Sequence, residues 1–546
     1  MAGITFKKSE IERYVKLTPE IIEKINLLGT TVENNSDEWL TLEILPNRPD
    51  LLSAQGFGRA LSSFLGKETG LKKYPVKKPE ANYKVIIDSS VKQVRPFTVC
   101  AIVKNIKLDE EKIRELIDLQ EKLHTTIGRN RKKLAIGIYP LEKISLPINY
   151  IARPPKDIWF TPLDSQRELN GLQILQQHPT GRKYAHLLEK EKLFPVFVDS
   201  KNKILSMPPI INSNDTGKIT LDTNEVFIEC SGFDLRVLNK VLNIITTTLA
   251  ECSGTIYSMI CEYSKSNKII TPDLKPEKMK ISLENTNKIL GLNLKEKDLQ
   301  KLLPKMGYDY ENKTAYIPAW RTDILHEVDI IEDIAIAYGY NNLVPEIPKV
   351  ATTGQESDKS ILQRKVSEIL AGLGLIEISS YHLIRPEEAK NMKIHQMVEL
   401  ENAKTEYKVL RPNLLISALR ILSENKDHEY PQKIFEIGTI FSHHLDKESE
   451  TQINEESNLT IAVSPGNFTE IKKILDYLTR TLDLKYELKE KDKHEFIPGR
   501  LAQIIINNTQ IGTIGEIHPE TLILFNMKMP VAVLEINLDK IIELVK

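Results

Sequence analysis

The sequence predicts an α+β protein built from several domains. With 546 residues the chain is too long for one hydrophobic core, and about three to five domains are expected. Segments with the period of a helix and segments with the alternation of a strand follow one another along the whole chain. Hydrophobic residues make up 41% and charged residues 27% of the sequence, proportions that are ordinary for a soluble globular protein.

Composition and turn signals divide the chain into four domains and a linker. The stretch NNLVPEIPKVATTG is marked by prolines and predicts a linker before the last domain. The predicted ranges are 1–85 for a mixed N-terminal domain, 86–268 for the longest domain, 269–346 for a small module, 347–359 for the linker and 360–546 for the last domain.

Charge and cysteine content exclude several classes of protein. The formal net charge is −1, so a nucleic acid would have to be bound by local basic patches. The 4 cysteines form no C-x-x-C pair, which argues against a disulfide framework or a zinc site. The first residues lack the apolar core of a signal peptide, and no run reaches membrane-spanning length. We therefore expect a soluble, cytoplasmic protein with no membrane partner.

The N-terminal domain is predicted to open with a helix. Thr18 is its expected N-cap, ahead of a proline, and Gly29 its expected end. A strand over 39–45 is followed by a second helix that contains Gly56 and Gly58. A dinucleotide-binding loop would need a strand leading into these glycines and a third glycine after them. We therefore interpret them as positions where helices pack closely.

A helix that ends near His124 carries polar side chains on its apolar face. Ile113, Leu116 and Ile117 are expected to point inward, and Gln120 and His124 fall on the same side. A buried polar group must find a partner or it costs about 1–3 kcal/mol. Gln120 and His124 are therefore expected to have hydrogen-bond partners.

A short basic segment follows that helix. Arg129, Arg131, Lys132 and Lys133 lie close together and lead into the run LAIGIY, which predicts a strand. Such a cluster is able to hold a phosphate or a 3′-terminal nucleotide. It is equally typical of a solvated turn, and charge alone does not separate the two interpretations.

Two further polar residues lie in apolar surroundings. The stiff segment SMPPIIN ends on Asn212, and Glu229 lies within the run VFIEC. A carboxylate there either ends a strand at a wet edge or is held by hydrogen-bond donors in a pocket. Asp234 is expected to cap the next helix. This domain contains no Ser-His-Asp, Cys-His or metal motif, so any hydrolysis here is expected to use a positioned water.

The small module ends in an acidic helix. Residues 327–338 have the helical period, and Asp329, Glu332 and Asp333 are predicted to project from the face opposite to the apolar one. Asp323 lies just before the helix, where it could cap it or reach a shared ion. Like charges one turn apart repel, whereas magnesium or calcium bound by oxygen ligands would stabilise them. The alternative is a solvated acidic face.

The whole module is predicted to be winged-helix-like. Two helices around 282–303, a short strand and the acidic helix follow one another closely. Fold analogy alone would suggest DNA binding. The acidic helix would repel phosphates, however, so we expect no DNA partner.

Strands and helices alternate in the last domain. Its first helix is predicted to carry a capping box from Ser360 to Gln363, and the Asn-Asn pair at 507–508 to form a hairpin turn. Glu436 and Arg500 are present. Yet no run of alternating glycines ends in an arginine, and no Arg-x-Glu lies on the strands to hold ATP.

Several of these motifs resemble those of phenylalanyl-tRNA synthetase β subunits, over nearly the whole chain and in the family's domain order. The most specific match is PAWRTD at 318–323, followed by DIIED at 329–333 and YGYNN at 338–342. NRPD, with the helix after it, resembles the family's N-terminal domain, where it is structural. LQEKLH, GRNRKKLAIGIY, SMPPIIN and FIECSGFD resemble the editing domain of the archaeal and eukaryotic type. The chain ends soon after the catalytic-like domain, which also favours that type over the bacterial one.

The resemblance implies a fold and a set of sites. It implies an α/β editing domain and a C-terminal class II synthetase-like antiparallel sheet without an active site, used for dimerisation and docking. The positions expected to bind magnesium near the α subunit are Asp323, Asp329, Glu332 and Asp333. The positions expected in the editing pocket are Gln120, Arg131, Asn212 and Glu229. A hydrogen-bonded structural network would use the same residue types.

The resemblance also implies a function. Two copies of this chain would join two phenylalanyl-tRNA synthetase α subunits to attach phenylalanine to tRNA(Phe) with ATP and magnesium. The synthetic site is expected on the α subunit, while this chain binds tRNA and hydrolyses mischarged Tyr-tRNA(Phe). Glu229 and Asn212 would read the tyrosine hydroxyl or amine. The alternatives are a self-sufficient class II ligase and a non-enzymatic scaffold or tRNA-binding subunit with an inactive editing domain.

Overall fold

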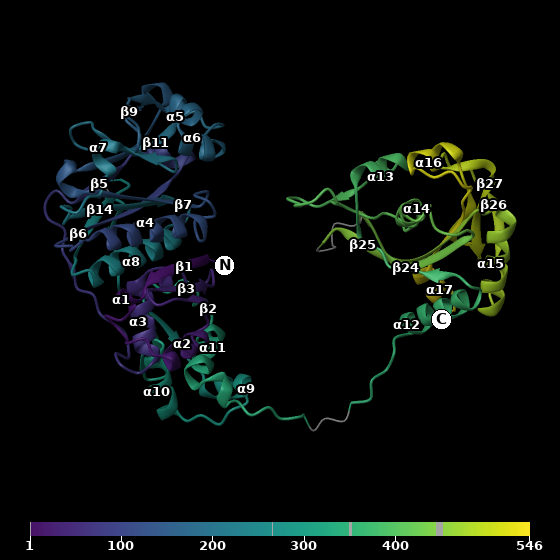
Figure 1. The fold of residues 1–546 in the computed structure, drawn as a ribbon, viewed down its shortest axis with the longest axis horizontal. Coiled ribbons are helices and arrows are strands. Elements are labelled where there is room, and N and C mark those ends of the chain that lie inside the picture. Colours follow the sequence, from purple (N-terminus) through teal and green to yellow (C-terminus); the bar gives the residue numbers. More distant parts are fainter. Residues whose placement is uncertain (1, 265, 349–351, 444–450, 546) are drawn as a thin grey trace. The chain divides into compact units, whose positions relative to one another are not determined.

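The computed structural model describes residues 2–264, 266–348, 352–443 and 451–545. The chain forms two compact units, the N-terminal unit Met1–Ile347 and the C-terminal unit Pro348–Lys546. In Figure 1 the N-terminal unit runs from purple to teal and the C-terminal unit from green to yellow. Within the described ranges, no helix has the length and apolarity needed to cross a membrane.

The N-terminal unit mixes helices with many short strands. Its α-helices are α1 (Lys8–Ile11), α2 (Pro19–Leu27), α3 (Ala54–Phe64), α4 (Glu110–Thr125), α5 (Gly171–Gln177), α6 (Pro179–Tyr184), α7 (Asn214–Gly217), α8 (Leu235–Glu251), α9 (Leu283–Leu290), α10 (Glu296–Lys305) and α11 (Glu327–Tyr338). Its 3-10 helices are η1 (Pro49–Leu51), η2 (Ser89–Gln93), η3 (Leu141–Lys143), η4 (Pro155–Asp157), η5 (Ala185–Leu187) and η6 (Tyr340–Asn342).

The strands of this unit are β1 (Ala2–Lys7), β2 (Thr31–Asn35), β3 (Trp39–Ile44), β4 (Val76–Lys77), β5 (Lys84–Ile87), β6 (Phe97–Lys104), β7 (Leu134–Pro140), β8 (Ile148–Arg153), β9 (Trp159–Phe160), β10 (Leu169–Asn170), β11 (Phe194–Val198), β12 (Ile204–Met207), β13 (Ile211–Asn212), β14 (Val226–Gly232), β15 (Thr255–Glu262), β16 (Lys268–Thr271), β17 (Glu277–Lys280), β18 (Asp309–Glu311) and β19 (Thr314–Ile317).

The first residues fold into a three-stranded antiparallel sheet in the order β1-β3-β2. The Thr18 side chain accepts a hydrogen bond from the backbone N–H of Ile21 and caps α2, as predicted. Gly29 follows that helix with φ +86°, the left-handed conformation that commonly ends helices.

The glycines of α3 allow close packing. A Cβ at Gly56 would overlap the carbonyl oxygen of Asp50, and a Cβ at Gly58 would overlap the ring of Tyr14. Both glycines are buried within the helix. The interpretation of these residues as packing positions is therefore confirmed.

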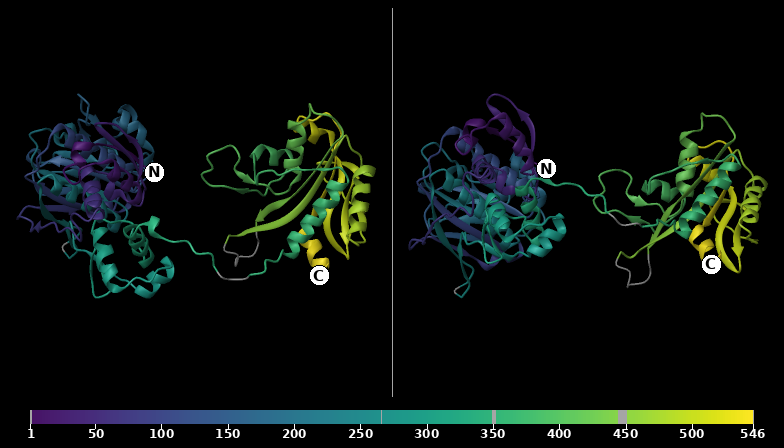
Figure 2. Two further views of the ribbon diagram at one scale, coloured as in Figure 1. Left: turned by 60° about the horizontal axis from the view of Figure 1, so that its bottom comes forward. Right: turned by 90° about the horizontal axis from the view of Figure 1, so that it is seen from below.

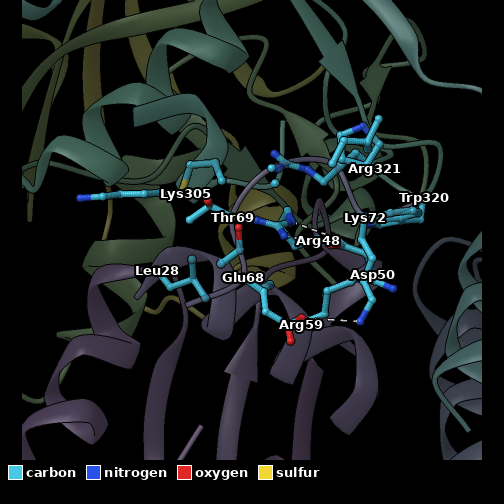
Figure 3. Close-up of a pocket in the computed structure, with 17 residues that line it drawn as sticks. Leu28, Arg48, Asp50, Arg59, Glu68, Thr69, Lys72, Lys305, Trp320 and Arg321 are labelled. Atoms are coloured by element: carbon cyan, nitrogen blue, oxygen red, sulfur yellow. Dashed lines mark hydrogen bonds and ion pairs between the residues drawn. The ribbon is translucent and has the colours of Figure 1, made fainter. Parts of the chain in front are cut away.

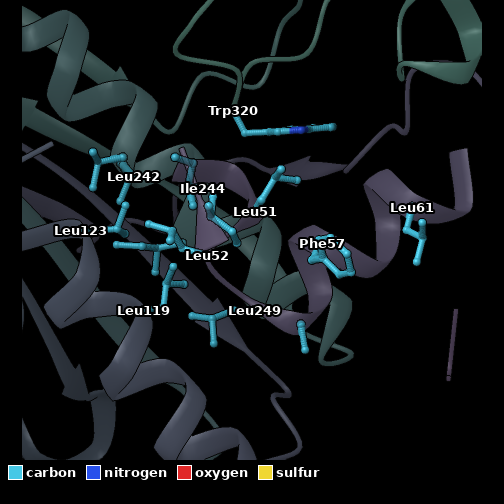
Figure 4. Close-up of a cluster of buried hydrophobic side chains, with 14 of the residues drawn as sticks. Leu51, Leu52, Phe57, Leu61, Leu119, Leu123, Leu242, Ile244, Leu249 and Trp320 are labelled. Atoms are coloured by element: carbon cyan, nitrogen blue, oxygen red, sulfur yellow. The ribbon is translucent and has the colours of Figure 1, made fainter. Parts of the chain in front are cut away.

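An 11-stranded sheet forms the centre of the N-terminal unit. Its main path is β13-β12-β11-β8-β5-β15-β6-β14-β7, and β4 and β16 also pair with β15. Figure 4 shows Leu119 and Leu123 of α4 in one buried cluster with Leu242 and Leu249 of α8, close to Leu51 of η1. The large sheet and the N-terminal strands therefore share a core.

The inner face of α4 differs from the prediction. Leu116, Leu119 and Leu123 are buried, whereas Ile117 is 51% exposed. The helix meets the sheet along the line that runs through Leu116 and Leu119, so the predicted position of Ile117 is wrong. Ile117 instead lines the cavity described below.

The module predicted to be winged-helix-like follows the large sheet. Helices α9, α10 and α11 combine with a small sheet in the order β17-β19-β18. Both α9 and α10 pack against α11. Tyr308, Ala315 and Ile330 belong to the same continuous core as the large sheet. The module is therefore part of the N-terminal unit.

The C-terminal unit is organised around a long, mainly antiparallel sheet. Its α-helices are α12 (Asp358–Gly372), α13 (Pro386–Asn391), α14 (Leu415–Glu424), α15 (Phe468–Thr481), α16 (Pro519–Leu524) and α17 (Leu538–Val545). Its strands are β20 (Ile376–Glu377), β21 (Leu383–Ile384), β22 (Val398–Glu399), β23 (Val409–Leu410), β24 (Gln432–His443), β25 (Ile453–Ser464), β26 (Glu487–Glu490), β27 (Phe496–Ile506), β28 (Thr509–Ile517) and β29 (Ala532–Asn537).

Helices cover both faces of this sheet, whose strand order is β20-β24-β25-β29-β28-β27-β26 (Figures 1 and 2). Successive residues of a strand point to opposite faces. Phe435 and Ile461 pack with α12, α15 and α17, while Ile434 and Ala462 pack with α13, α14 and α16. Each face therefore has its own hydrophobic core.

Local predictions in this unit have mixed outcomes. The residues at 507–508 have φ values of 47° and 63° and join β27 to β28 in the predicted hairpin. The capping box predicted from Ser360 to Gln363 is wrong, because α12 begins earlier and Ser357 accepts a hydrogen bond from the N–H of Ser360. The Gln363 side chain instead donates to Ser457 at 2.8 Å.

Candidate functional site

A cavity of about 410 Å³, lined by both polar and apolar side chains, opens beside α4. Its walls come from α4, from strands β7 and β14, from the segment between β12 and β13, and from α7. Segments that are far apart in the sequence meet here because the large sheet folds them together. The residues expected in an editing pocket all line this one cavity: Gln120, Arg131, Asn212 and Glu229.

Arg131 spans one wall of the cavity. Its Nη1 donates to the carbonyl oxygen of Ile210 at 2.8 Å, and its Nη2 donates to Oε1 of Glu121 at 2.6 Å. The guanidinium lies over the ring of Tyr184, 4.5 Å from its centroid. Its buried Nε has no hydrogen-bond partner among the described residues. The side chain is thus held in place with one donor unused.

The backbone at Arg131 is unusual. Residues 129–131 have successive φ values of 47°, 53° and 64°, a conformation that costs free energy for residues other than glycine. Arg129, Lys132 and Lys133 are exposed and do not line the cavity. Lys218, which follows α7, adds a second cation to the lining. Only part of the predicted basic cluster therefore contributes to the cavity itself.

Glu121 is a cavity residue that sequence reasoning missed. The backbone N–H of Ile136 donates to Nε2 of His124 at 2.8 Å, so the proton of the neutral imidazole is on Nδ1. That Nδ1 lies 3.1 Å from Oε1 of Glu121 and donates to it. Gln120 donates to the carbonyl oxygen of Ile136 at 2.9 Å. Gln120 and His124 therefore have the partners that their burial requires.

Charge states in this network follow from burial and contacts. Burial lowers the pKa of His124, which favours the neutral ring. Burial also acts to raise the pKa of Glu121, but the His124 hydrogen bond and the charge of Arg131 outweigh it and lower that pKa to about 2. Glu121 is therefore a carboxylate at neutral pH and forms an ion pair with Arg131.

Glu229 differs from Glu121 in its protonation state. Its side chain is 1% exposed, and the Tyr139 hydroxyl donates to its Oε1 at 3.2 Å. Oε2 has no hydrogen-bond partner in the described part of the chain. Burial raises the pKa of Glu229 to about 8, although the charge of Arg95 opposes this shift. Glu229 is therefore enclosed in a pocket, mostly protonated at neutral pH, and able to donate a hydrogen bond.

Two neighbours that the sequence did not reveal position Glu229. The Tyr139 hydroxyl lies 3.4 Å from Oδ1 of Asn212, so it lies between the two predicted pocket residues. Gly137 pairs directly with Glu229 across β7 and β14. A Cβ at Gly137 would lie 2.6 Å from Oε1 of Glu229 and would overlap the Tyr139 hydroxyl. Gly137 therefore provides the space in which these side chains meet.

Asp323 and Asp333 of the winged-helix-like module share an arginine, and the burial of Asp333 differs from the prediction. Arg321 donates to both carboxylate oxygens of Asp323, at 2.8 and 2.7 Å, and to Oδ2 of Asp333 at 2.7 Å. The Tyr308 hydroxyl also donates to Asp333. Asp333 is buried by these contacts and does not project from an exposed face. Asp323 pairs with the arginine and does not cap α11.

Other residues cap this helix. His326 is its N-cap, and Oδ2 of Asp329 accepts hydrogen bonds from the N–H groups of Leu325 and His326, each at 2.7 Å. Glu332 is exposed. Across the described ranges, no three His, Cys, Asp or Glu side chains gather closely enough to hold a metal ion. The acidic residues do not fit an ion held by this chain alone, because Asp323 and Asp333 are already paired with Arg321.

Glu436 and Arg500 of the C-terminal unit have separate partners. Oε1 of Glu436 accepts from Nη1 of Arg411 at 2.7 Å, and both side chains are 2% exposed. The Ser380 hydroxyl donates to the same carboxylate. Arg500 donates to Oε2 of Glu516 at 2.5 Å. Each of the two residues is thus part of its own ion pair.

Comparison with known proteins identifies the family. The tRNA synthetase B5 domain matches residues 279–340, and the phenylalanyl tRNA synthetase beta chain CLM domain matches residues 343–538. The phenylalanine–tRNA ligase β subunit of Pyrococcus horikoshii is 40% identical over 557 residues, 98% of this chain and 99% of that protein. That of Archaeoglobus fulgidus is 37% identical and covers 99% of this chain and 98% of its own.

The chain belongs to the phenylalanine–tRNA ligase β-subunit family. The resemblance drawn from its sequence motifs is thereby confirmed, and the chain is a subunit of a ligase. A crystal structure of an N-terminal fragment of the Pyrococcus horikoshii phenylalanyl-tRNA synthetase β subunit matches with a TM-score of 0.59 and 38% identity. The match covers 62% of this chain and 99% of the fragment. The mixed multidomain architecture is consistent with this family.

Proposed function

We propose that this chain works with a phenylalanyl-tRNA synthetase α subunit, two copies of each, and supports the ATP-dependent attachment of phenylalanine to tRNA(Phe). Its own chemical role is editing, in which the cavity beside α4 hydrolyses Tyr-tRNA(Phe). The observation that carries this proposal is the convergence of Gln120, Arg131, Asn212 and Glu229 on one cavity of about 410 Å³. That volume lies within the range of small-molecule sites.

The cavity suits the recognition of a phenolic hydroxyl. Protonated Glu229 is able to donate to the tyrosine oxygen, and its unpaired Oε2 faces no competing partner in the described part of the chain. Phenylalanine would leave this buried polar group unpaired, which costs about 1–3 kcal/mol. A site built to hydrogen-bond a hydroxyl therefore discriminates strongly against the analogue that lacks it.

Hydrolysis requires a water beside the ester carbonyl. Neither serine nor cysteine is among the described lining residues, so water itself is the nucleophile. The water oxygen adds to the carbonyl carbon, the bond to the ribose oxygen breaks, and that oxygen leaves as a hydroxyl. Gln120, Arg131 and Asn212 supply donors that orient the carbonyl and the water.

Cations near the cavity suit the 3′ end of a tRNA. Arg131 and Lys218 belong to the lining, and Arg129, Lys132 and Lys133 are exposed on the turn beside it. Lysine and arginine neutralise phosphates and release their counterions. We assign the terminal phosphates to this turn and the aminoacyl ester to the cavity.

Magnesium belongs to the assembled enzyme in this proposal. Asp329 and Glu332 lie at the edge of α11, whereas Asp323 and Asp333 are paired with Arg321. The ion would bind at this edge only where the α subunit supplies further oxygen ligands, because magnesium demands near-octahedral coordination. The acidic helix and the C-terminal sheet are the proposed contacts with α.

Purification of the chain together with its α subunit provides the test. The complex is expected to charge tRNA(Phe) with phenylalanine and to release tyrosine from Tyr-tRNA(Phe). A non-enzymatic scaffold would bind α and tRNA but leave mischarged tRNA intact. A self-sufficient ligase would charge tRNA in the absence of α.

A further inference from the structure

A second cavity, of about 150 Å³, lies inside the N-terminal unit (Figure 3). Residues from η1, from α3 and from the segment after α3 form one side of it. Residues at the end of α10 and between β19 and α11 form the other side. The cavity therefore marks the place where the N-terminal strands and helices meet the winged-helix-like module. A direct hydrogen bond from the Thr322 hydroxyl to the carbonyl oxygen of Asn47, at 3.0 Å, joins the same two parts.

The lining of this cavity is mainly cationic. Its acidic residues are Asp50 and Glu68. Its basic residues are Arg48, Arg59, Lys72, Lys305 and Arg321. Further carboxylates behind the wall pair with some of these cations: Glu251 with Arg59 and Lys72, and Asp323 and Asp333 with Arg321. The wall itself presents more cations than carboxylates, which favours an anionic ligand over a metal ion.

Two of the arginines are held rigidly by neighbours. Nε and Nη2 of Arg48 donate to the two carboxylate oxygens of Asp50, each at 2.9 Å. Arg59 donates to the Tyr74 hydroxyl at 2.7 Å, and its guanidinium lies 4.2 Å from the centroid of the Trp320 ring. These contacts fix each planar group and leave other nitrogen donors unused, which is the preorganisation that a binding site requires.

Arg321 lacks a partner for one buried donor. Its side chain is 2% exposed, and its Nε and Nη2 donate to Asp323 and Asp333. Nη1 is buried and has no hydrogen-bond partner among the described residues. Arg321 lines the cavity, so an acceptor in the cavity that reaches Nη1 would satisfy this donor. An ionised acceptor would do so more strongly than a neutral one.

Arg48 and Arg321 also lie close enough to repel each other. Burial and the charge of Arg321 both act to lower the pKa of Arg48, and Asp50 keeps that pKa above its ordinary value. An anion between the two guanidiniums would relieve this repulsion. It would at the same time contact both parts of the N-terminal unit.

We propose that this cavity binds a phosphate-type oxyanion between Arg48 of the N-terminal domain and Arg321 of the winged-helix-like module. Donors reach the cavity from several segments, which suits tetrahedral phosphate oxygens better than a planar carboxylate. Lys305 and Lys72 provide further charge. The bound anion fastens the two parts together. Its source is either free inorganic phosphate or the phosphate of a nucleotide, because both present the same oxygens.

Isothermal titration of the full-length chain with inorganic phosphate tests the proposal, with AMP and acetate as parallel ligands. Lys305→Glu changes the cavity, and Lys301→Glu makes the same change of charge at an exposed residue of α10 outside it. Arg48→Lys keeps the positive charge but removes the planar guanidinium group and its paired N–H donors. We expect phosphate to bind the natural chain, Lys305→Glu and Arg48→Lys each to weaken it about tenfold, and Lys301→Glu to change it less than about twofold.

The ligand series separates the two sources. AMP that binds at least about tenfold more tightly than phosphate supports a nucleotide, and AMP that binds equally or more weakly supports the free ion. Acetate that binds as tightly as phosphate overturns the assignment to phosphate. The proposal is also overturned if phosphate at about 10 mM gives no binding, or if Lys305→Glu and Lys301→Glu bind it equally.

Discussion

The hydroxyl of Tyr139 donates to Oε1 of Glu229 at 3.2 Å, from one strand of the large sheet to its neighbour. Both side chains are buried. Glu229 is thus held by a neutral hydrogen-bond donor rather than by a cation in direct contact. Burial is the main cause of its raised pKa. The pair gives the cavity a proton donor at neutral pH.

Replacing Glu229 with glutamine is expected to remove a pH-dependent loss of stability. Burial raises the pKa of Glu229 from 4.5 to about 8, so the folded chain binds more protons than the unfolded chain between these values. This contribution to stability is complete below pH 4.5 and is lost as the pH rises through about 8. Urea unfolding should show Glu229→Gln gaining stability over the natural chain as the pH rises from 4.5 to about 8, by a few kcal/mol in all.

Glu225→Gln, just before the same strand and outside the cavity lining, is the matched control for that experiment. The difference in stability between Glu225→Gln and the natural chain should be the same at both ends of the pH range. A Glu229→Gln difference that does not change with pH would contradict the raised pKa.

A methyl group at Gly137 is expected to impair editing. The new Cβ would lie 2.6 Å from Oε1 of Glu229 and would force the Tyr139 hydroxyl to move. Overpacking of this kind costs about 1–3 kcal/mol, and release of tyrosine from Tyr-tRNA(Phe) should fall at least about tenfold. Gly372→Ala is the control, because a Cβ there meets nothing within 4 Å. Equal activity of the two variants would contradict the role given to Gly137.

Loss of the Arg321 charge is expected to destabilise the winged-helix-like module. Arg321→Met would leave Asp333, which is 4% exposed, without its counter-charge, and such a loss costs about 3–5 kcal/mol. Asp323→Asn should cost less, since Arg321 keeps its contact with Asp333. Urea unfolding measures both effects. Adding Asp333→Asn to Arg321→Met should recover part of the loss, and no recovery would argue against the ion pair as the cause.

Magnesium is expected to affect the assembly of this chain with the α subunit and not the folding of the chain. The thermal midpoint of the chain alone should change by less than about 1 °C on chelation of magnesium, since Asp323 and Asp333 are already paired with Arg321. Asp329→Ala combined with Glu332→Ala should weaken α binding, measured by sedimentation, more than it changes editing. Glu332→Ala alone is the control for the lost helix cap, because Asp329, and not Glu332, accepts hydrogen bonds from the N–H groups of Leu325 and His326 ahead of α11. Unchanged α affinity in both variants would count against an ion at this edge.

Elements whose determinants lie close together in the sequence could be predicted. Thr18 caps α2 and Asp234 caps α8 through hydrogen bonds to nearby backbone groups, and the turn at 507–508 needs only its own two residues. The orientation of Ile117 could not be predicted, because it depends on how α4 meets the sheet. Asp333 was misplaced because its burial depends on tertiary contacts with an arginine and a tyrosine.

Some residues of the candidate site could be predicted from the sequence and others could not. Family motifs pointed to Arg131 and Glu229, which line one cavity. Nothing in the run LAIGIYP distinguishes Gly137 and Tyr139 from ordinary strand residues. Their positions beside Glu229 follow from the pairing of β7 with β14, which no local pattern encodes. Glu121 likewise becomes meaningful only when Arg131 folds back onto α4.

Release of tyrosine and of phenylalanine from tRNA(Phe) by the complex with α tests the editing proposal most directly. The natural chain should release tyrosine selectively, and Arg131→Ala should slow this release by about 10- to 100-fold. Arg236→Ala, which removes the same charge from an exposed residue of α8 outside the cavity, should retain most of the activity. The absence of selective tyrosine release from the natural complex would contradict the account.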